Sequence, residues 1–251
     1  RMFSRTTRSV SLTPAGRQLL DRVGPPLQDI AAAIDGINDF RDTPQGLLRI
    51  NAPRPAGELV LGPLVAEFLT RHPKAEVELV LDDGFVDIVA GGFDAGVRYG
   101  ESLQQDMVAL PLGPPQRLMV VCAPALLERV GTPHTPRDLL TLPCVRIRFP
   151  SGARYAWEFE KAGEKVAVDV EGRLTVGEMP LMLQAALAGV GFAYMYEPFA
   201  RAALASGALV SVLDDWCLSI PGFYLYYPSR KLPTATLAAF IEMVKAAQRQ
   251  G

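Results

Sequence analysis

The chain has 251 residues, of which 49% are hydrophobic and 21% are charged, and its formal net charge is −2. This balance is typical of a globular protein with a sizeable core, and it excludes a strongly basic or acidic chain. No apolar run approaches the length of a membrane span, and the N-terminus lacks an apolar signal-peptide core. The three cysteines are far apart and lack metal-ligand spacing, so we expect reduced thiols in a cytoplasmic protein with no membrane contact.

The N-terminal segment is basic although the whole chain is nearly neutral. Residues 1–20 contain four arginines and no acidic residue. Val10 and Leu12 alternate with polar residues, as in a short strand. Arginines and hydroxyls on a short hairpin suit contacts with DNA phosphates, and the predicted contacts are Arg5, Thr6, Thr7, Arg8 and Ser9. A solvated basic tail is the alternative interpretation.

Residues 13–42 predict a long helix with one narrow apolar seam. Thr13-Pro14 is a good helix start, and Thr43-Pro44 is a good stop. The seam has alternating spacings of three and four and consists of Leu20, Val23, Leu27, Ile30, Ile34 and Ile37. Such a stripe favours pairing with the same helix of a second chain, although an ordinary amphipathic helix is the alternative. The proline pair at 25–26 predicts a kink.

From Gly46 onward short apolar strands alternate with helices, which predicts an α/β body with a mostly parallel sheet. In the first half we expect strands at 47–51, 76–81, 93–98, 108–112 and 118–123, with helices at 55–70 and 86–90. In the second half we expect strands at 144–149, 156–162, 165–174, 192–196 and 209–213, with helices at 124–130, 178–188 and 198–206. A strand at 222–228 and a helix at 237–246 close the chain.

The sequence carries no motif for catalysis, a metal or a nucleotide cofactor. The only histidines, His72 and His134, stand beside prolines or threonines and away from any nucleophile motif. The glycines do not form a phosphate-binding loop or a dinucleotide fingerprint. We therefore predict no catalytic residue, no metal ligand and no cofactor.

Two junctions between a strand and a helix predict a ligand site, at 51–56 and at 177–180. Helix N-termini offer free amide donors, and ligands of doubly wound sheets lie at the carboxyl ends of strands. The expected ligand-binding residues are Pro53, Arg54, Pro55, Arg98, Glu101, Ser102, Arg148, Gly177, Glu178 and Tyr196. Arg98 has a structural alternative, an ion pair with Asp94 or Glu101.

The charge of the ligand stays open. Arg146 and Arg148 alternate in one strand, so both are expected on the same side, and a planar guanidinium suits a carboxylate. Glu178, however, would oppose an anionic ligand.

Several stretches along the chain resemble one protein family. Residues 3–16, Phe-Ser-Arg-Thr-Thr-Arg-Ser-Val-Ser-Leu-Thr-Pro-Ala-Gly, resemble the wing and linker start of the LysR-type transcriptional regulators. Residues 86–98, Val-Asp-Ile-Val-Ala-Gly-Gly-Phe-Asp-Ala-Gly-Val-Arg, and residues 185–191, Ala-Ala-Leu-Ala-Gly-Val-Gly, are similar to the effector-binding region of that family. So are the shorter stretches at 46–51, 72–73 and 157–159. Gly91 stands where the family commonly has glutamate, and Gly177-Glu178 replaces a pair that usually begins with asparagine.

The resemblance implies a fold and its divisions. It implies a two-lobed, periplasmic-binding-protein-like effector domain of type 2, preceded by a winged-helix remnant and a long linker helix. The implied divisions are a wing at 1–13, a linker or dimerisation helix at 14–45, lobe one at 46–118 with 221–251, and lobe two at 119–220. The recognition helix would precede residue 1, so this chain alone is not expected to bind an operator specifically.

The implied function is transcription regulation. The full-length regulator would bind double-stranded DNA at a promoter and a small-molecule effector between the lobes, as a homodimer or homotetramer. A solute-binding protein of a transport system would share the two lobes, but it should carry a leader and lack the seam and the wing. An enzyme on the same scaffold would need a reactive constellation in the cleft.

Overall fold

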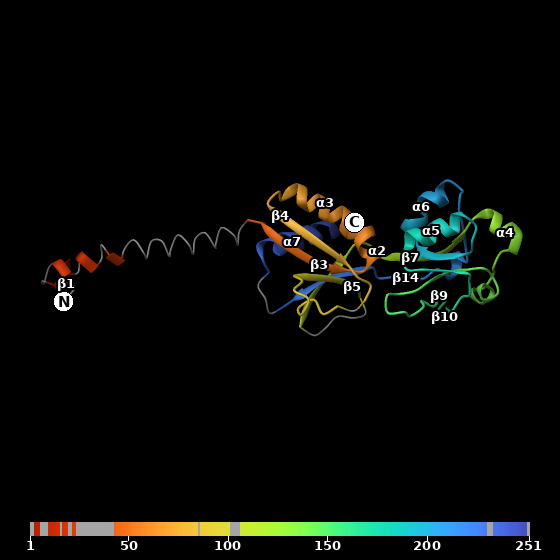
Figure 1. Ribbon diagram of the computed structural model, residues 1–251, viewed down its shortest axis with the longest axis horizontal. Helices are drawn as coiled ribbons and strands as arrows, with labels where there is room; N and C mark the ends of the chain where they lie inside the picture. The colour runs from red at the N-terminus through yellow and green to blue at the C-terminus, as the bar shows by residue number, and fades with distance from the viewer. Residues whose placement is uncertain are drawn as a thin grey trace.

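The computed structural model describes residues 3–5, 10–15, 17–19, 22–23, 43–84, 86–100, 106–229 and 233–249. From residue 43 onward the chain forms two lobes of mixed α/β structure that lie end to end (Figure 1). Among the described helices none is long and apolar enough to cross a membrane.

The N-terminal segment begins with the hairpin that the sequence predicts. Strand β1 (Phe3–Arg5) pairs antiparallel with β2 (Val10–Leu12), and Phe3 lies opposite Leu12. Helix follows at 14–15, 17–19 and 22–23, and the Val23 side chain is exposed. The remaining seam residues, and Thr6, Thr7, Arg8 and Ser9 of the predicted DNA contacts, lie outside the described residues. The seam and the DNA contacts therefore stay predictions.

Lobe one is a five-stranded sheet whose order is β4-β3-β5-β15-β6. Its strands are β3 (Gly46–Ala52), β4 (Ala75–Leu81), β5 (Ala95–Tyr99), β6 (Met107–Leu112) and β15 (Phe223–Pro228). Strand β3 runs parallel to β4 and β5, whereas β15 is antiparallel to β5 and β6. The prediction of a mostly parallel sheet is therefore wrong, because the last strand returns from lobe two and enters between two earlier strands.

The core of lobe one lies between this sheet and its helices. The helical elements are α2 (Arg54–Ala56), the π-helical turn η1 (Gly57–Leu61), α3 (Gly62–Arg71) and α7 (Ala235–Gln248). Leu48 and Ile50 of the sheet pack in one buried cluster with Phe68 and Phe240, whose rings meet edge to face at 5.3 Å. Thr234 caps α7, because its side chain accepts a hydrogen bond from the Leu237 amide.

Lobe two is organised around β7 (Gln116–Cys122). Three strands pair antiparallel with β7, namely β12 (Ala193–Tyr196), β13 (Val210–Val212) and β14 (Ser219–Ile220). Two further pairs are β8 (Val145–Ile147) with β11 (Leu174–Val176), and β9 (Trp157–Lys161) with β10 (Glu164–Val168). The helices are α4 (Pro124–Val130), α5 (Met179–Leu187) and α6 (Glu197–Ala205), with short 3-10 turns η2 (Pro136–Leu140) and η3 (Asp214–Trp216).

Two further expectations are corrected. The segment at 86–90 is a single turn and not a helix. The Asp87 carboxylate accepts the amides of Val89 (2.9 Å) and Ala90 (3.1 Å), as at a helix start, but Gly92, with a φ of +68°, ends the segment after one turn. The expected strand at 165–174 is two strands, since β10 ends at Val168 and β11 begins at Leu174.

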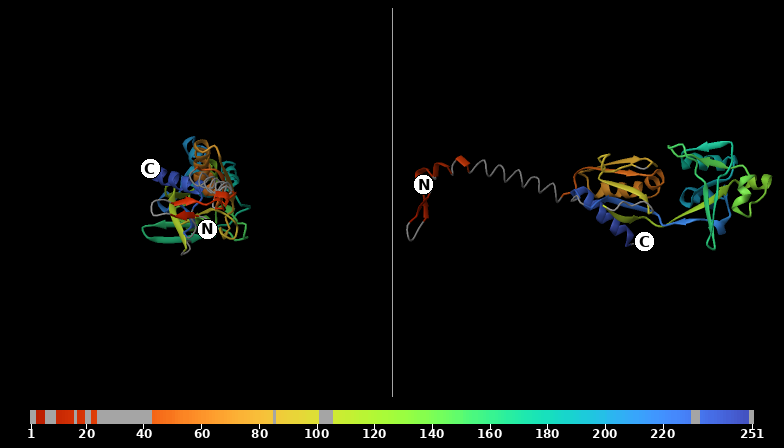
Figure 2. Two further views of the ribbon diagram at one scale, coloured as in Figure 1. Left: turned by 90° about the vertical axis from the view of Figure 1, so that its left-hand side faces the viewer. Right: turned by 90° about the horizontal axis from the view of Figure 1, so that it is seen from below.

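The chain crosses between the lobes twice, after β6 and after β14 (Figure 2). The two crossings touch, because a Cβ placed on Gly222 would lie 2.6 Å from the carbonyl oxygen of Pro114. Gly222 also has a φ of +94°, which disfavours any other residue. Two independent constraints thus require glycine at the second crossing.

Gly222→Ala is expected to lower the free energy of unfolding by roughly 2–4 kcal/mol, because it adds a steric clash to the cost of a positive φ. Gly207→Ala is the matched control, since Gly207 has a φ of +74° and open space around its Cβ position. The control should lose only about 1–2 kcal/mol. Urea denaturation of both variants measures the difference, and equal losses would contradict the close approach of the crossings.

Candidate functional site

A cavity of about 400 Å³ lies between the lobes. This volume is in the range of pockets that hold small molecules. Lobe one contributes the β3–α2 junction, the segment after β4 and the end of β5. Lobe two contributes the end of β8, the β11–α5 junction and β12, and the second crossing closes one side.

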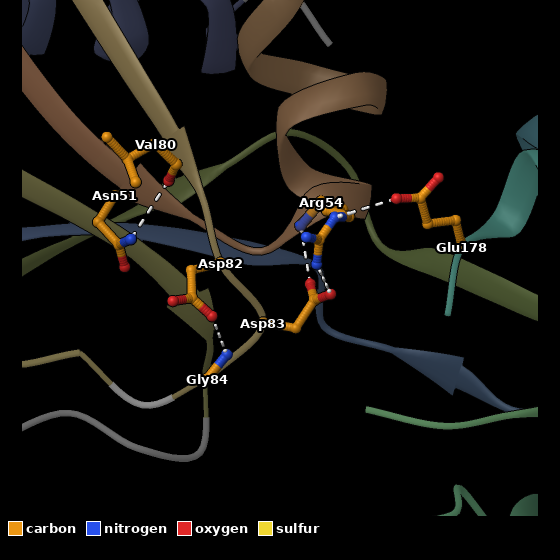
Figure 3. Close-up of polar contacts among 7 residues, drawn as sticks. All are labelled: Asn51, Arg54, Val80, Asp82, Asp83, Gly84 and Glu178. Atoms are coloured by element: carbon orange, nitrogen blue, oxygen red, sulfur yellow. Dashed lines mark hydrogen bonds and ion pairs between the residues drawn. The ribbon is translucent and has the colours of Figure 1, made fainter. Parts of the chain in front are cut away.

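Arg54 is held at the lobe-one wall by Asp83. The Asp83 carboxylate accepts the backbone amide of Arg54 at 2.9 Å and its guanidinium at 2.7 Å (Figure 3). Because β3 and β4 are parallel neighbours, the segments that follow them meet at one sheet edge. The hydrogen bond from Asp83 raises the pKa of Arg54, so its charge is fixed.

Glu178 faces Arg54 from the other lobe. Its carboxylate lies 3.7 Å from the Arg54 guanidinium, so an ion pair spans the cleft (Figure 3). Glu178 is the residue before α5. The side chains of Arg54 and Glu178 are 32% and 53% exposed, and an ion pair with this exposure stabilises by at most about 1 kcal/mol.

Tyr99 and Tyr196 form a second bridge between the lobes. Their hydroxyl oxygens lie 2.7 Å apart, one from the end of β5 and the other from the end of β12. Both rings pack against Phe223, with centroids 5.2 and 6.4 Å away. Burial raises the pKa of both phenols, so both stay protonated at neutral pH.

Aromatic side chains form the lobe-two wall. Phe149 meets Tyr155 edge to face at 5.8 Å, and Tyr155 stacks on Tyr194 at 6.2 Å. The Tyr155 hydroxyl donates to the Glu158 carboxylate at 3.2 Å. The Tyr194 hydroxyl donates to the backbone carbonyl of the same glutamate. Glu158 thus fixes two rings of the wall.

Most of the predicted ligand residues lie together in this cavity. Those that line it are Pro53, Arg54, Pro55, Arg148, Gly177, Glu178 and Tyr196. Glu101 and Ser102 lie outside the described residues. Their role in binding an effector stays a prediction.

Arg98 does not line the cavity, contrary to expectation. It is 8% exposed, and it donates to the Asn51 side chain and to the Val97 carbonyl, each at 2.7 Å. Successive side chains of a strand alternate between faces, so Tyr99 reaches the cavity and Arg98 does not. The alternative pairing with Asp94 is not observed either, since the Asp94 carboxylate accepts the backbone amide of Arg49.

Arg146 also differs from its neighbour. It pairs with Glu171 at 3.1 Å, whereas Arg148 lines the cavity. Strand β8 ends at Ile147, so Arg148 lies beyond the regular alternation that placed both arginines on one side.

Several lining residues were missed from the sequence, namely Glu58, Asp83, Tyr99, Phe149, Tyr155, Glu158 and Tyr194. Asp83 had a usable signal, because it follows a strand parallel to the one that precedes Arg54. Tyr155 and Glu158 had none, since they come from an irregular segment and an outward position of β9.

The site offers little reactive chemistry. Among the described residues no cluster of histidine, cysteine or acidic side chains could hold a metal ion. Burial raises the pKa of Cys122 to about 11 and that of Cys144 to about 12, so both thiols stay protonated. The arrangement is that of a binding site with charged, hydroxyl and aromatic walls.

Comparison with known proteins decides the family. The LysR substrate binding domain matches residues 41–249. The chain belongs to the LysR family of transcriptional regulators. The HTH-type transcriptional regulator YcaN of Escherichia coli K12 is 42% identical over 248 residues, which are 99% of this chain and 81% of the relative.

Solved structures agree with the two-lobed LysR fold. The LysR-type regulator CrgA of Neisseria meningitidis has a TM-score of 0.69 and 26% identity, covering 98% of this chain and 83% of that one. The Vibrio cholerae virulence activator AphB, with a TM-score of 0.71, 24% identity and the same coverage, supports the fold alone. The family and its named members are regulators, which disfavours a transport or catalytic role.

The two tyrosine hydroxyls should couple energetically. In a double-mutant cycle of Tyr99→Phe, Tyr196→Phe and the pair, the coupling energy should be about 0.5–1.5 kcal/mol, the net value of one hydrogen bond. Urea denaturation of the four proteins measures it. Additive losses would show that the hydroxyls do not bridge the lobes in solution.

Proposed function

We propose that this chain is the sensing part of a LysR-type regulator in which a small molecule binds between the lobes and changes promoter binding. The observation that carries the proposal is the cavity between the lobes, lined by both and crossed by only slight polar contacts among the described residues. An effector there would contact lobe one through Arg54 and Tyr99, and lobe two through Arg148, Glu178 and Tyr196.

The polar contacts between the lobes are weak enough to permit such a switch. The exposed Arg54–Glu178 pair contributes at most about 1 kcal/mol, and the Tyr99–Tyr196 hydrogen bond about 1 kcal/mol. A ligand of micromolar affinity gains about 8 kcal/mol on binding. If the ligand binds one lobe arrangement better than the other by only part of this free energy, it shifts the populations of the two arrangements. The crossings near Pro114 and Gly222 would be the hinges.

A change in the lobe arrangement would be passed through the linker helices to the DNA-binding domains. The basic hairpin with Arg5 and Arg8 suits phosphate contacts with double-stranded DNA, and the apolar seam suits a homodimer or homotetramer. Such a regulator would work in the cytoplasm. We propose no catalytic step, because burial keeps the Tyr99 and Tyr196 phenols of the cavity and the Cys122 thiol of the lobe-two core protonated.

The full-length protein is expected to bind its own upstream DNA specifically, and residues 1–251 alone should not. Binding should weaken steeply between about 50 and 200 mM salt, because phosphate contacts release counterions. A mobility-shift titration at two salt concentrations, with an unrelated DNA of equal length as control, tests this. Equal binding to both DNAs would contradict a regulator of its own region.

The linker seam is expected to hold the dimer. Ile30→Asp with Ile34→Asp should shift residues 1–251 toward smaller species in sedimentation velocity, because two charges would be buried in the seam. Gln28→Asp adds a charge beside the seam and is the control. An unchanged sedimentation profile for the double variant would assign the helix to another role.

A further inference from the structure

The cavity has an excess of negative charge. Its described lining contains two guanidiniums, from Arg54 and Arg148, and four carboxylates, from Glu58, Asp83, Glu158 and Glu178, so the balance is 2 − 4 = −2. Building on the function proposed above, we propose that the effector carries a protonated amine on an apolar body of about the size of a substituted ring.

One of the two cations is already engaged. Arg54 lies 2.7 Å from Asp83 and 3.7 Å from Glu178, so two carboxylates share its charge. Arg148 is the one other cation of the described lining, which also contains the carboxylates of Glu58 and Glu158. An anionic effector would thus compete with carboxylates for Arg54, whereas a cation would meet carboxylates that lack a full partner.

The pKa of Glu58 reflects the same excess of negative charge in the cavity. Burial, and next the negative charge of Glu178, raise the pKa of Glu58, while Arg54 only partly opposes them. A positively charged ligand near these groups would relieve their repulsion, and an anion would add to it.

The aromatic walls of the cavity suit the apolar body of such a ligand. Phe149, Tyr155 and Tyr194 present neighbouring rings from lobe two. Aromatic faces attract cations as well as apolar groups. The Tyr99–Tyr196 pair also has a second hydroxyl hydrogen that is not needed for their mutual bond.

Two features of the lining would favour an anion instead, namely the Arg148 guanidinium and the N-terminus of α5, whose dipole favours negative charge. Glu178 stands at that terminus, so a carboxylate of the protein already occupies the vicinity. The negative charge of Glu178 makes this helix terminus poorly suited to an anionic ligand.

The test compares three probes with one body: 3-phenylpropylamine, 3-phenylpropanol and 3-phenylpropionate. Isothermal titration of residues 1–251 at pH 7 should give an amine affinity at least about tenfold above that of the carboxylate, with the alcohol between them. The advantage of the amine should shrink at about 0.5 M salt, because exposed charges are screened.

Two variants locate the effect. Glu58→Gln and Glu178→Gln keep the side-chain shape, and each should weaken amine binding about threefold or more and narrow the gap to the carboxylate. Glu164→Gln removes an exposed glutamate of β10 outside the cavity lining and should change neither affinity. Melting temperatures of the three variants check that each is folded.

The outcomes separate this inference from the function on which it rests. Carboxylate binding as tight as amine binding, or no amine binding at millimolar concentration, would overturn the proposed ligand class while the DNA titration still supported a regulator. An amine preference abolished by Glu178→Gln, together with no specific DNA binding by the full-length protein, would keep the ligand class and reject the regulator.

Discussion

The close passage of two chain segments between the lobes is the constraint on which the structure depends. Gly222 lies against the Pro114 carbonyl with a φ that only glycine adopts easily, so the outgoing and returning segments are fixed side by side. The return then delivers β15 into lobe one between β5 and β6, antiparallel to both. The mixed sheet and the cavity beside Gly222 are both consequences of this passage.

Each wall of the cavity is held by hydrogen bonds within its own lobe, and the described polar contacts between the lobes are fewer. Within lobe one, Asp83 fixes Arg54 through two hydrogen bonds. Within lobe two, Glu158 accepts hydrogen bonds from Tyr155 and Tyr194. Between the lobes, the described polar contacts are one exposed ion pair and one hydroxyl pair. Each wall can therefore keep its shape while the distance between the walls changes, which is what a sensor of small molecules requires.

Hydrophobic periodicity and strand ends predicted much of this arrangement. The features that they did not predict depend on backbone conformation, side-chain orientation and long-range strand pairing. The junctions at Arg54 and Glu178 were found because a strand followed by a helix start is visible in the sequence. The helix expected at 86–90 is only a turn because Gly92, with a φ of +68°, ends it after one turn. Arg98 was placed wrongly because a strand end alone does not tell which face a side chain takes. The return of β15 depends on distant pairings that local patterns do not encode.

Arg54 contacts both lobes of the cavity, and its two carboxylate partners differ in how firmly they hold it. Its two short bonds to Asp83 stay within one lobe, whereas its contact with Glu178 is longer and crosses the cleft. If the lobes separate, the Glu178 contact is lost first and Arg54 keeps its partner. Among the described residues that line the cavity, Arg148 is the only cation from lobe two, so Glu178 becomes the more available carboxylate for a ligand. A ligand that neutralises Glu178 would thus take the place of Arg54 as the partner of this carboxylate. Glu178 would then both recognise the ligand and release the contact that joins the lobes.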